Sequence, residues 1–209
     1  ADVRECGRTD NFWGPTGNEG PCGPTTEIYA GGIEIWNLVF NEYFGASDGS
    51  LKPLSTPGVD TGLGLERLAM IAQKTPTIFE TDLFKPLIEA TDGNLPEAKR
   101  RILADHARAI SHLILDGVRP SNKGAGYILR RLIRRMISFG QNTDLIKLLN
   151  LVTENGLVLE EFNKEKEVFG KALESGLREL EKAENINAAQ AFQLYETYGL
   201  PFELIQEKF

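Results

Sequence analysis

The sequence contains no apolar stretch that approaches the roughly 20 residues needed to span a bilayer. Its N-terminal residues also lack the apolar centre of a secretory signal, so neither a membrane protein nor an exported one is expected. Cysteine is scarce: Cys6 and Cys22 are the only two, and they do not form a C-x-x-C pair. The sequence therefore predicts neither a zinc cluster nor a disulfide framework, and no other metal site, and a reducing, cytoplasmic setting fits it best.

Basic residues are also fewer than acidic ones, so the chain of 209 residues has a formal net charge of −7. Taken alone, this value argues against a protein that binds nucleic acid. The average conceals an asymmetry, however. Residues 98–140 contain ten Lys and Arg residues but only Asp105 and Asp116, which gives this segment a net charge of +8. The segment is therefore predicted to bind a polyanion.

The first part of the chain indicates a sheet followed by helices. Glycine and proline are dense in residues 14–32, which predicts a structured loop rather than a central strand. The apolar, aromatic run over 33–44 predicts a long buried strand, and 51–62 an antiparallel return strand. Apolar residues at helical spacing then predict a helix over about 63–74. A second helix is predicted to begin at Thr81 or Asp82.

The second part is predicted to be almost entirely helical. Gly93 and Pro96 mark the expected domain boundary, between residues 94 and 95. Apolar periodicity then predicts helices over about 98–115, 127–139, 144–154 and 157–184, the last with an apolar stripe typical of core packing. A closing helix is expected to end at Gly199 as its C-terminal cap, and Pro201 to open another short helix.

The helix over 127–139 carries four arginines on one face: Arg130, Arg131, Arg134 and Arg135. At about 100° per residue they fall within an arc of about 140°, and the apolar residues occupy the opposite side. A solvated surface is one explanation. Such surfaces normally interleave acids, however, and no carboxylate lies between Lys123 and Gly140. We therefore predict four unpaired guanidiniums that bind phosphates, and a preceding loop whose glycines, Gly124 and Gly126, allow close approach.

The stretch "VDTGLGLER", residues 59–67, has two interpretations. Its glycines precede a helix, whose N-terminus can bind an anion, with Arg67 adding a positive charge. It can equally be only a turn, since the third glycine of the dinucleotide fingerprint is missing. Asp60 and Asn37 favour a substrate-binding site over a simple turn. A carboxylate suits the ammonium group of a substrate, and an amide is expensive to bury without a hydrogen-bond partner. The competing explanation is that Asn37 caps a turn and Asp60 pairs with Arg67.

Seven blocks in this order resemble the alanyl-tRNA synthetase family over essentially the whole chain: "DNFW" (10–13), "GPCGPTTEIY" (20–29), "EIWNLVF" (34–40), "VDTGLGLER" (59–67), "ADHARA" (104–109), "DGVRPSNKGAGYILRRLIRR" (116–135) and "LYETYGLP" (194–201). The resemblance implies a class II aminoacyl-tRNA synthetase of the α+β class. Residues 1–94 would be the distal part of its antiparallel catalytic domain with flanking helices, and 95–209 a mainly helical tRNA-recognition domain. ATP, with Mg²⁺ as its counter-ion, and alanine would be substrates, and no zinc is expected in this segment.

The resemblance also implies roles for individual residues. Arg67, with Gly62 and Gly64, would bind ATP, and "GLGLER" is similar to the third signature motif of the class. Asp60 would hold the alanine ammonium group and Asn37 would bind the substrate. Gly62 would leave space for the small side chain of alanine, and Trp13 and Val39 would wall the pocket.

In the helical part, the resemblance implies contacts with the tRNA(Ala) acceptor stem, and no DNA or membrane partner. Asn122 and Glu196 would flank its G3:U70 wobble pair, although the family often has aspartate where Glu196 stands. Residues expected to lie on the acceptor stem are Lys123, Tyr127, Arg130, Arg131, Arg134 and Arg135. His106 and His112 are expected to be structural.

Two signature motifs of the class are not found in the sequence, and neither are the family's editing and oligomerisation regions. The chain is therefore expected to be the middle of a longer enzyme and to have little or no activity by itself. A spacing shorter than in many relatives, between "EIYA" and "GGIEIW", indicates a compact bacterial enzyme. Two alternatives remain for the isolated chain: a non-catalytic module that binds the acceptor stem, and a helical scaffold without RNA affinity.

Overall fold

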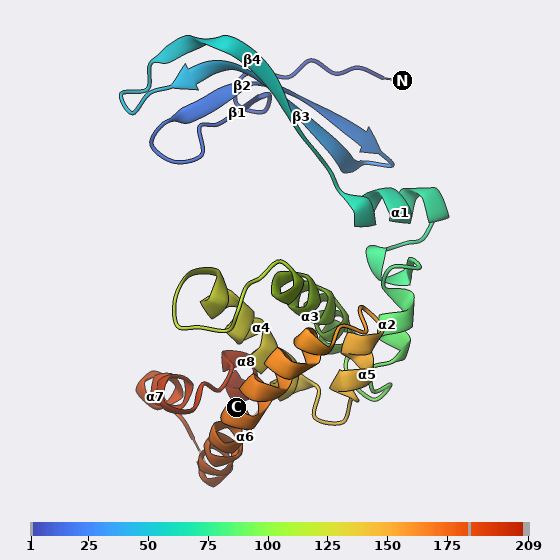
Figure 1. Cartoon of the computed structure of the whole chain (residues 1–209), viewed down its shortest axis with the longest axis vertical. Coiled ribbons are helices and arrows are strands. Elements are labelled where there is room, and N and C mark those ends of the chain that lie inside the picture. Colours follow the sequence, from blue (N-terminus) through green and yellow to red (C-terminus); the bar gives the residue numbers. More distant parts are fainter. Residues whose placement is uncertain (1, 184, 207–209) are drawn as a thin grey trace. The chain divides into compact units, whose positions relative to one another are not determined.

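The computed structural model describes residues 2–183 and 185–206. The chain forms two compact units, of which the first ends at Leu83 and the second begins at Phe84. The first unit contains an antiparallel sheet and short helices, and the second is helical (Figure 1). The predicted α+β fold class is therefore confirmed. The boundary expected between residues 94 and 95 lies within the second unit, and the assignment of the two parts to separate functions stays a prediction.

The sheet contains four antiparallel strands in the order of the sequence: β1 (Phe12–Trp13), β2 (Gly20–Ala30), β3 (Ile33–Gly45) and β4 (Leu51–Leu63). A two-residue turn joins β2 to β3, with Ala30 opposite Ile33. Gly31 and Gly32 have φ angles of 58° and 81°, the left-handed values that such a hairpin turn requires at both positions. This turn fixes the register of the hairpin, and the strands predicted over 33–44 and 51–62 are confirmed. The expected burial of the first strand was wrong, because most of its side chains are only half-buried and Trp36 and Phe40 are each 37% exposed.

The prediction of a loop over the whole of residues 14–32 was wrong, because residues 20–30 form β2. This strand tolerates its turn-forming residues because its register with β3 shifts between Cys22 and Thr25. Gly23 lies in the shift, where a Cβ would come within 1.7 Å of the Phe40 carbonyl oxygen. The residues that argued against a strand are thus the ones that permit the irregularity.

Three short helices follow the sheet: α1 (Leu65–Gln73), the 3₁₀ helix η1 (Ile78–Glu80) and α2 (Lys85–Glu89). The helix predicted to begin at Thr81 or Asp82 begins later, and neither residue caps it. Thr77 instead forms a capping box with Glu80, which starts η1 at an earlier position. Thr81 caps the C-terminal end of η1, and its hydroxyl donates a hydrogen bond back to the Ile78 carbonyl.

The second unit continues with α3 (Glu97–Leu115), α4 (Gly124–Phe139), α5 (Leu145–Asn150), α6 (Gly156–Lys182), α7 (Ala188–Tyr198) and α8 (Phe202–Gln206). Helices α3, α4 and α6 pack on one another and form its core (Figure 1). The apolar stripe of α6 belongs to this core, since Phe162 and Phe169 are buried. The closing helix ends at Gly199 as predicted, and α8 follows Pro201.

Candidate functional site

Four of the residues expected to bind alanine lie together on one face of the sheet. In the β3–β4 ladder, Asn37 lies opposite Gly62 and Val39 lies opposite Asp60. Residues directly opposite in a ladder share a face, and so do residues two apart along one strand. Val39 is 5% exposed, Asn37 is half-buried, and Asp60 is exposed. The register therefore makes the Asn37 amide and the Asp60 carboxylate diagonal neighbours on this face, next to a residue without a side chain.

Glu27 on β2 is a further polar residue of this face that the sequence did not reveal. It lies opposite Asn37, whose Nδ2 atom donates to Glu27 Oε1 at 3.5 Å. The Tyr29 hydroxyl donates to the other carboxylate oxygen at 2.6 Å, and this hydrogen bond raises the pKa of Tyr29 above its usual value. Asn37 thus lies inside a strand and is paired, so the alternative that it caps a turn was wrong.

The glycine-rich turn joins β4 to α1. Gly64 is the N-cap residue of α1, and its own N–H donates to the Ile35 carbonyl at 3.0 Å. No side chain caps the first turn of the helix, so the positive end of its dipole is open to an anion. The turn therefore starts a helix, whose first turn also contains the acidic residue Glu66, and the expected binding of an anion at this terminus stays a prediction.

Arg67 projects from the first turn of α1 and is held on β3. Its guanidinium donates to the Glu34 carbonyl at 2.9 Å and lies 3.4 Å from the Glu34 carboxylate. The side chain of Arg67 is 52% exposed, and the alternative pairing with Asp60 is not found. Because a guanidinium has five N–H donors, this arrangement leaves donors for a phosphate.

Trp13 lies farther from the other residues of the expected pocket. It belongs to β1, at the edge of the sheet, and β2 separates it from Val39 on β3. Its partner in the ladder is Gly23, and the indole is 41% exposed. The role of Trp13 as a wall of the alanine pocket stays a prediction.

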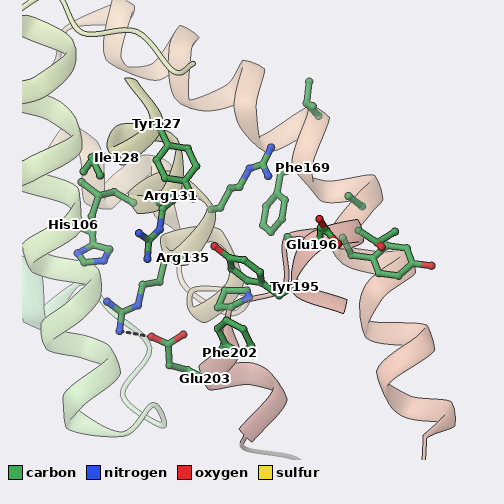
Figure 2. A pocket seen from close by; sticks show the side chains of 18 of the residues that line it. His106, Tyr127, Ile128, Arg131, Arg135, Phe169, Tyr195, Glu196, Phe202 and Glu203 are labelled. Carbon is green, nitrogen blue, oxygen red and sulfur yellow. Dashed lines mark ion pairs between the residues drawn. The ribbon is translucent and has the colours of Figure 1, made fainter. Parts of the chain in front are cut away.

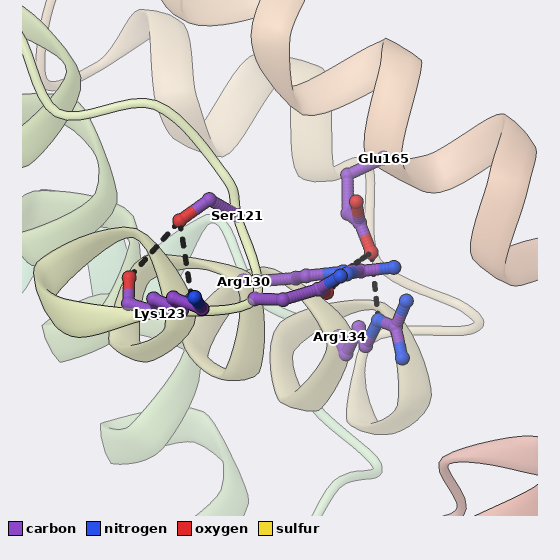
Figure 3. A network of polar contacts seen from close by, with 6 residues as sticks. Ser121, Lys123, Arg130, Arg134 and Glu165 are labelled. Atoms are coloured by element: carbon purple, nitrogen blue, oxygen red, sulfur yellow. Dashed lines mark hydrogen bonds and ion pairs between the residues drawn. The ribbon is translucent and has the colours of Figure 1, made fainter.

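In the second unit, the prediction of four unpaired guanidiniums was wrong for three of them. Arg130 Nε and Arg134 Nε donate to the same oxygen of Glu165, at 3.0 and 2.7 Å (Figure 3). Arg135 pairs with Glu203 at 2.9 Å. Both acids come from other helices, α6 and α8, so inspection of the sequence next to the arginines could not reveal them.

Arg131 is the exception. Within residues 2–183 and 185–206 no carboxylate pairs with it, and its guanidinium lies 5.9 Å from the centre of the Tyr127 ring. Both residues are exposed. Of the four arginines, Arg131 is thus the one most available to a phosphate.

The loop before α4 carries Asn122 and Lys123, which are both exposed. The Arg130 guanidinium donates to Asn122 Oδ1. Gly126 is buried, and a Cβ there would lie 2.3 Å from Ser121 Oγ and 2.4 Å from the Arg119 carbonyl oxygen. The absence of a side chain at Gly126 therefore serves the packing of the loop itself, and not the approach of a ligand as the sequence had suggested.

A cavity of about 920 Å³ lies between α4, α6, α7 and α8 and gathers several of the expected tRNA-binding residues. Tyr127, Arg131, Arg134, Arg135 and Glu196 all line it, and Figure 2 shows most of them from close by. Asn122, Lys123 and Arg130 do not line it. The structure thus divides the expected RNA-binding residues between this cavity and the loop before α4.

Aromatic rings form one wall of the cavity. Tyr195 stacks on Phe202, with ring centres 4.7 Å apart and an angle of 15° between the planes. A hydrogen bond with Tyr127 raises the pKa of the Tyr195 hydroxyl. His106 also lines the cavity; it is 6% exposed, and its Nδ1 atom lies 3.2 Å from the Asp105 carboxylate.

Residues 30–208 match the family described as tRNA synthetases class II (A). The chain belongs to this family. Its curated relatives are named alanine–tRNA ligase. The protein from Ruthia magnifica subsp. Calyptogena magnifica is 37% identical to the synthetase chain, with 97% of the chain and 29% of the relative covered. The protein from Francisella tularensis subsp. novicida is 40% identical, with 94% and 28% covered.

A third relative, from Legionella pneumophila (strain Lens), is 39% identical, with 95% of the synthetase chain and 28% of the relative covered. The synthetase chain therefore spans less than a third of the length of these relatives. The match with the Ruthia protein extends over 252 residues, more than the 209 of the chain, so that relative has extra residues within the aligned region.

In the described part of the chain, no helix is both long enough and apolar enough to cross a membrane.

Three acidic residues that pair with the expected site residues were not predicted from the sequence: Glu27, Glu165 and Glu203. Glu27 was hidden because its strand was interpreted as a loop. The signal would have been the spacing of Glu27 and Tyr29, because residues two apart on a strand lie on the same face.

Proposed function

We propose that the protein to which this chain belongs activates alanine with ATP and transfers it to tRNA(Ala). The observation that supports this most strongly is the ladder register that places Asn37 and Val39 beside Gly62 and Asp60 in a chain of this family. The Asp60 carboxylate would bind the alanine ammonium group, and the Asn37 amide would donate to the alanine carboxylate. At Gly62 no atom lies within 4 Å of where a Cβ would stand, so this position leaves room for the substrate.

In this proposal the alanine carboxylate attacks the α-phosphate of ATP, and pyrophosphate leaves. A terminal ribose hydroxyl of the tRNA then attacks the alanyl carbonyl, and AMP leaves. No side-chain nucleophile is needed, because positioning and neutralisation of charge accelerate both steps. Arg67 and the uncapped N-terminus of α1 would hold phosphate oxygens.

Mg²⁺ would accompany ATP and neutralise charge on its phosphates. On the same sheet face, the Glu27 carboxylate is an oxygen donor of the kind that Mg²⁺ prefers. Glu27 already accepts two hydrogen bonds, which holds its carboxylate in a fixed orientation.

The second unit would bind the acceptor stem of tRNA(Ala). Arg131 and Lys123 are exposed cations for phosphates, and Glu196 and Asn122 are the residues expected to flank the G3:U70 pair. Arg130, Arg134 and Arg135 have protein carboxylates as partners, so their contribution to phosphate binding would be smaller than the sequence suggested.

A second candidate function for the 209-residue chain is a module that binds the acceptor stem without chemistry. It is favoured by the location of all the expected RNA-binding residues in the second compact unit. Filter binding of an acceptor-stem duplex and ATP–pyrophosphate exchange, measured on the same chain, separate the two. Alanine-dependent exchange would support the catalytic function for the chain itself, and RNA binding without exchange would support the module. A scaffold without function in RNA binding would show no salt-dependent affinity for the duplex.

A further inference from the structure

A chain of three polar side chains links α6, by way of Arg130 on α4, to the loop before α4. Glu165 on α6 accepts from Arg130 Nε, and the Arg130 guanidinium donates to Asn122 Oδ1. We infer that Glu165, acting through Arg130, orients the Asn122 amide so that its two N–H donors face outward to RNA. This inference rests on the proposed reading of the acceptor stem by Asn122, and it makes Glu165 and Arg130 positioning residues for that contact.

The chemistry of the guanidinium fixes which end of the amide faces it. An arginine side chain only donates hydrogen bonds, so the atom of Asn122 that meets Arg130 must be the acceptor, Oδ1. The Nδ2 atom is then on the other side of the amide. Asn122 is exposed, so its donors are available to a ligand.

Burial of Glu165 fixes the position of Arg130 in turn. Glu165 is 8% exposed, and a buried carboxylate without partners carries a large desolvation penalty. Arg134 donates to the same oxygen at 2.7 Å, so the carboxylate is held from a second position on α4 (Figure 3). The Arg130 side chain is 26% exposed and lies between this anchor and the loop.

The orientation has a consequence for which atoms of RNA Asn122 selects. The minor groove of an RNA helix is wide and shallow, and it displays ribose 2′-hydroxyls and base edges. Two outward N–H donors select acceptors there, such as a pyrimidine O2 atom or a 2′-oxygen. They do not suit the guanine N2 amino group, which is itself a donor.

The test measures how strongly the 209-residue chain prefers an acceptor-stem duplex with G3:U70 over one in which cytosine replaces U70. Both bases carry an O2 atom, but it accepts from guanine N1 in the wobble pair and from guanine N2 in the G:C pair, so its position in the minor groove differs between the two duplexes. Filter binding gives the ratio of the two dissociation constants for each variant. We expect Asn122→Ala to reduce the preference about tenfold if the amide reads a base edge. Glu165→Gln and Arg130→Met should reduce it by a similar factor, and Asn122→Ala combined with Arg130→Met should reduce it no further than either alone.

Two controls match these changes. Glu161→Gln makes the same substitution as Glu165→Gln on the same helix, but Glu161 pairs with Lys164 at 3.0 Å, so the ratio should stay unchanged. Arg134→Met removes the other donor to Glu165 without touching Asn122. It should weaken binding to both duplexes and leave their ratio intact. Arg130→Met leaves Glu165 paired with Arg134. This variant therefore tests the positioning of Asn122 even if Glu165→Gln does not fold.

The orientation has a separate test in Asn122→Asp. Aspartate keeps an oxygen toward Arg130 but has no N–H donors, so it should lose the preference as alanine does. A retained preference in Asn122→Asp would overturn the assigned orientation. If Asn122→Ala leaves the ratio unchanged, Asn122 does not read the pair, and the proposed reading fails together with the inference. If Asn122→Ala reduces the ratio but Arg130→Met does not, the reading stands and the positioning role is wrong.

Discussion

Val39 and Asp60 are direct partners in the ladder between β3 and β4, so a buried apolar side chain and an exposed carboxylate lie side by side. A carboxylate next to an apolar surface is what a small amino acid needs for its ammonium group and its methyl group.

Asp60→Asn in the full-length enzyme should raise the KM for alanine and leave the KM for ATP nearly unchanged. The neutral amide cannot make a charge-assisted hydrogen bond, which is worth about 1.5–3 kcal/mol. Alanine-dependent ATP–pyrophosphate exchange measures both constants. Thr56→Val is the control on the same strand, since Thr56 is exposed and lies outside the part of β4 that pairs with Asn37 and Val39. An unchanged KM for alanine in Asp60→Asn would exclude Asp60 from the ammonium site.

Arg67→Ala in the full-length enzyme should raise the KM for ATP and spare affinity for tRNA. The reason is that Arg67 lies at the open N-terminus of α1, in the unit that does not carry the expected RNA-binding residues. ATP–pyrophosphate exchange at varied ATP concentration measures the KM for ATP, and filter binding measures the affinity for tRNA. Glu34→Gln is the companion variant: its ion pair with Arg67 is largely exposed, so losing it should cost no more than about 1 kcal/mol of stability. Equal loss of ATP and tRNA binding in Arg67→Ala would point to a folding defect instead.

Glu165→Gln should destabilise the chain more than Glu203→Gln does. Glu165 is almost fully buried and serves two arginines, whereas the Glu203 side chain is 43% exposed and serves one. We expect a loss of about 1–3 kcal/mol in the free energy of unfolding for Glu165→Gln, because two partly buried arginines lose their charged acceptor. For Glu203→Gln the loss should be about 0–1 kcal/mol. Urea unfolding followed by circular dichroism compares the variants, and equal losses would contradict the ranking.

Arg131→Ala should reduce the salt dependence of RNA binding. An arginine that neutralises a phosphate contributes about one unit to the slope of log affinity against log salt concentration. Arg131 has no carboxylate partner in the described part of the chain, whereas Arg135 is neutralised by Glu203. The slope, measured by filter binding at several salt concentrations, should therefore fall more for Arg131→Ala than for Arg135→Ala. The opposite order would mean that RNA displaces Glu203 from Arg135.

The sequence predicted those features that depend on neighbours along the chain. Helical periodicity located α3, α4 and α6, apolar and aromatic content located β3, and the turn after it located β4 as the return strand. Block spacing identified the family, and the register then brought Asn37 and Asp60 onto one face. Each of these signals is a pattern within a short segment of the sequence, or the order of such segments along the chain.

The features that the sequence did not predict depend on contacts between distant segments. Glu165 is 35 residues beyond Arg130, so the pairing needs the packing of α6 on α4, which no local pattern encodes. The glycines and prolines of β2 indicated a loop because the register shift that accommodates them exists only in the presence of β3. The role of Gly126 was misinterpreted for the same reason: the atoms it makes room for belong to Arg119 and Ser121, which the fold of the loop brings there.

The packing at Gly126 bears on the thermodynamics of recognition. The Ser121 N–H donates to the Gly126 carbonyl at 3.1 Å, and the Ser121 hydroxyl donates to the Lys123 carbonyl at 3.0 Å. The loop that presents Asn122 is thus closed by its own hydrogen bonds before any ligand arrives. Its conformational entropy is lost when the protein folds and not when it binds, so this loop gives a preorganised contact whose ordering does not weaken the affinity.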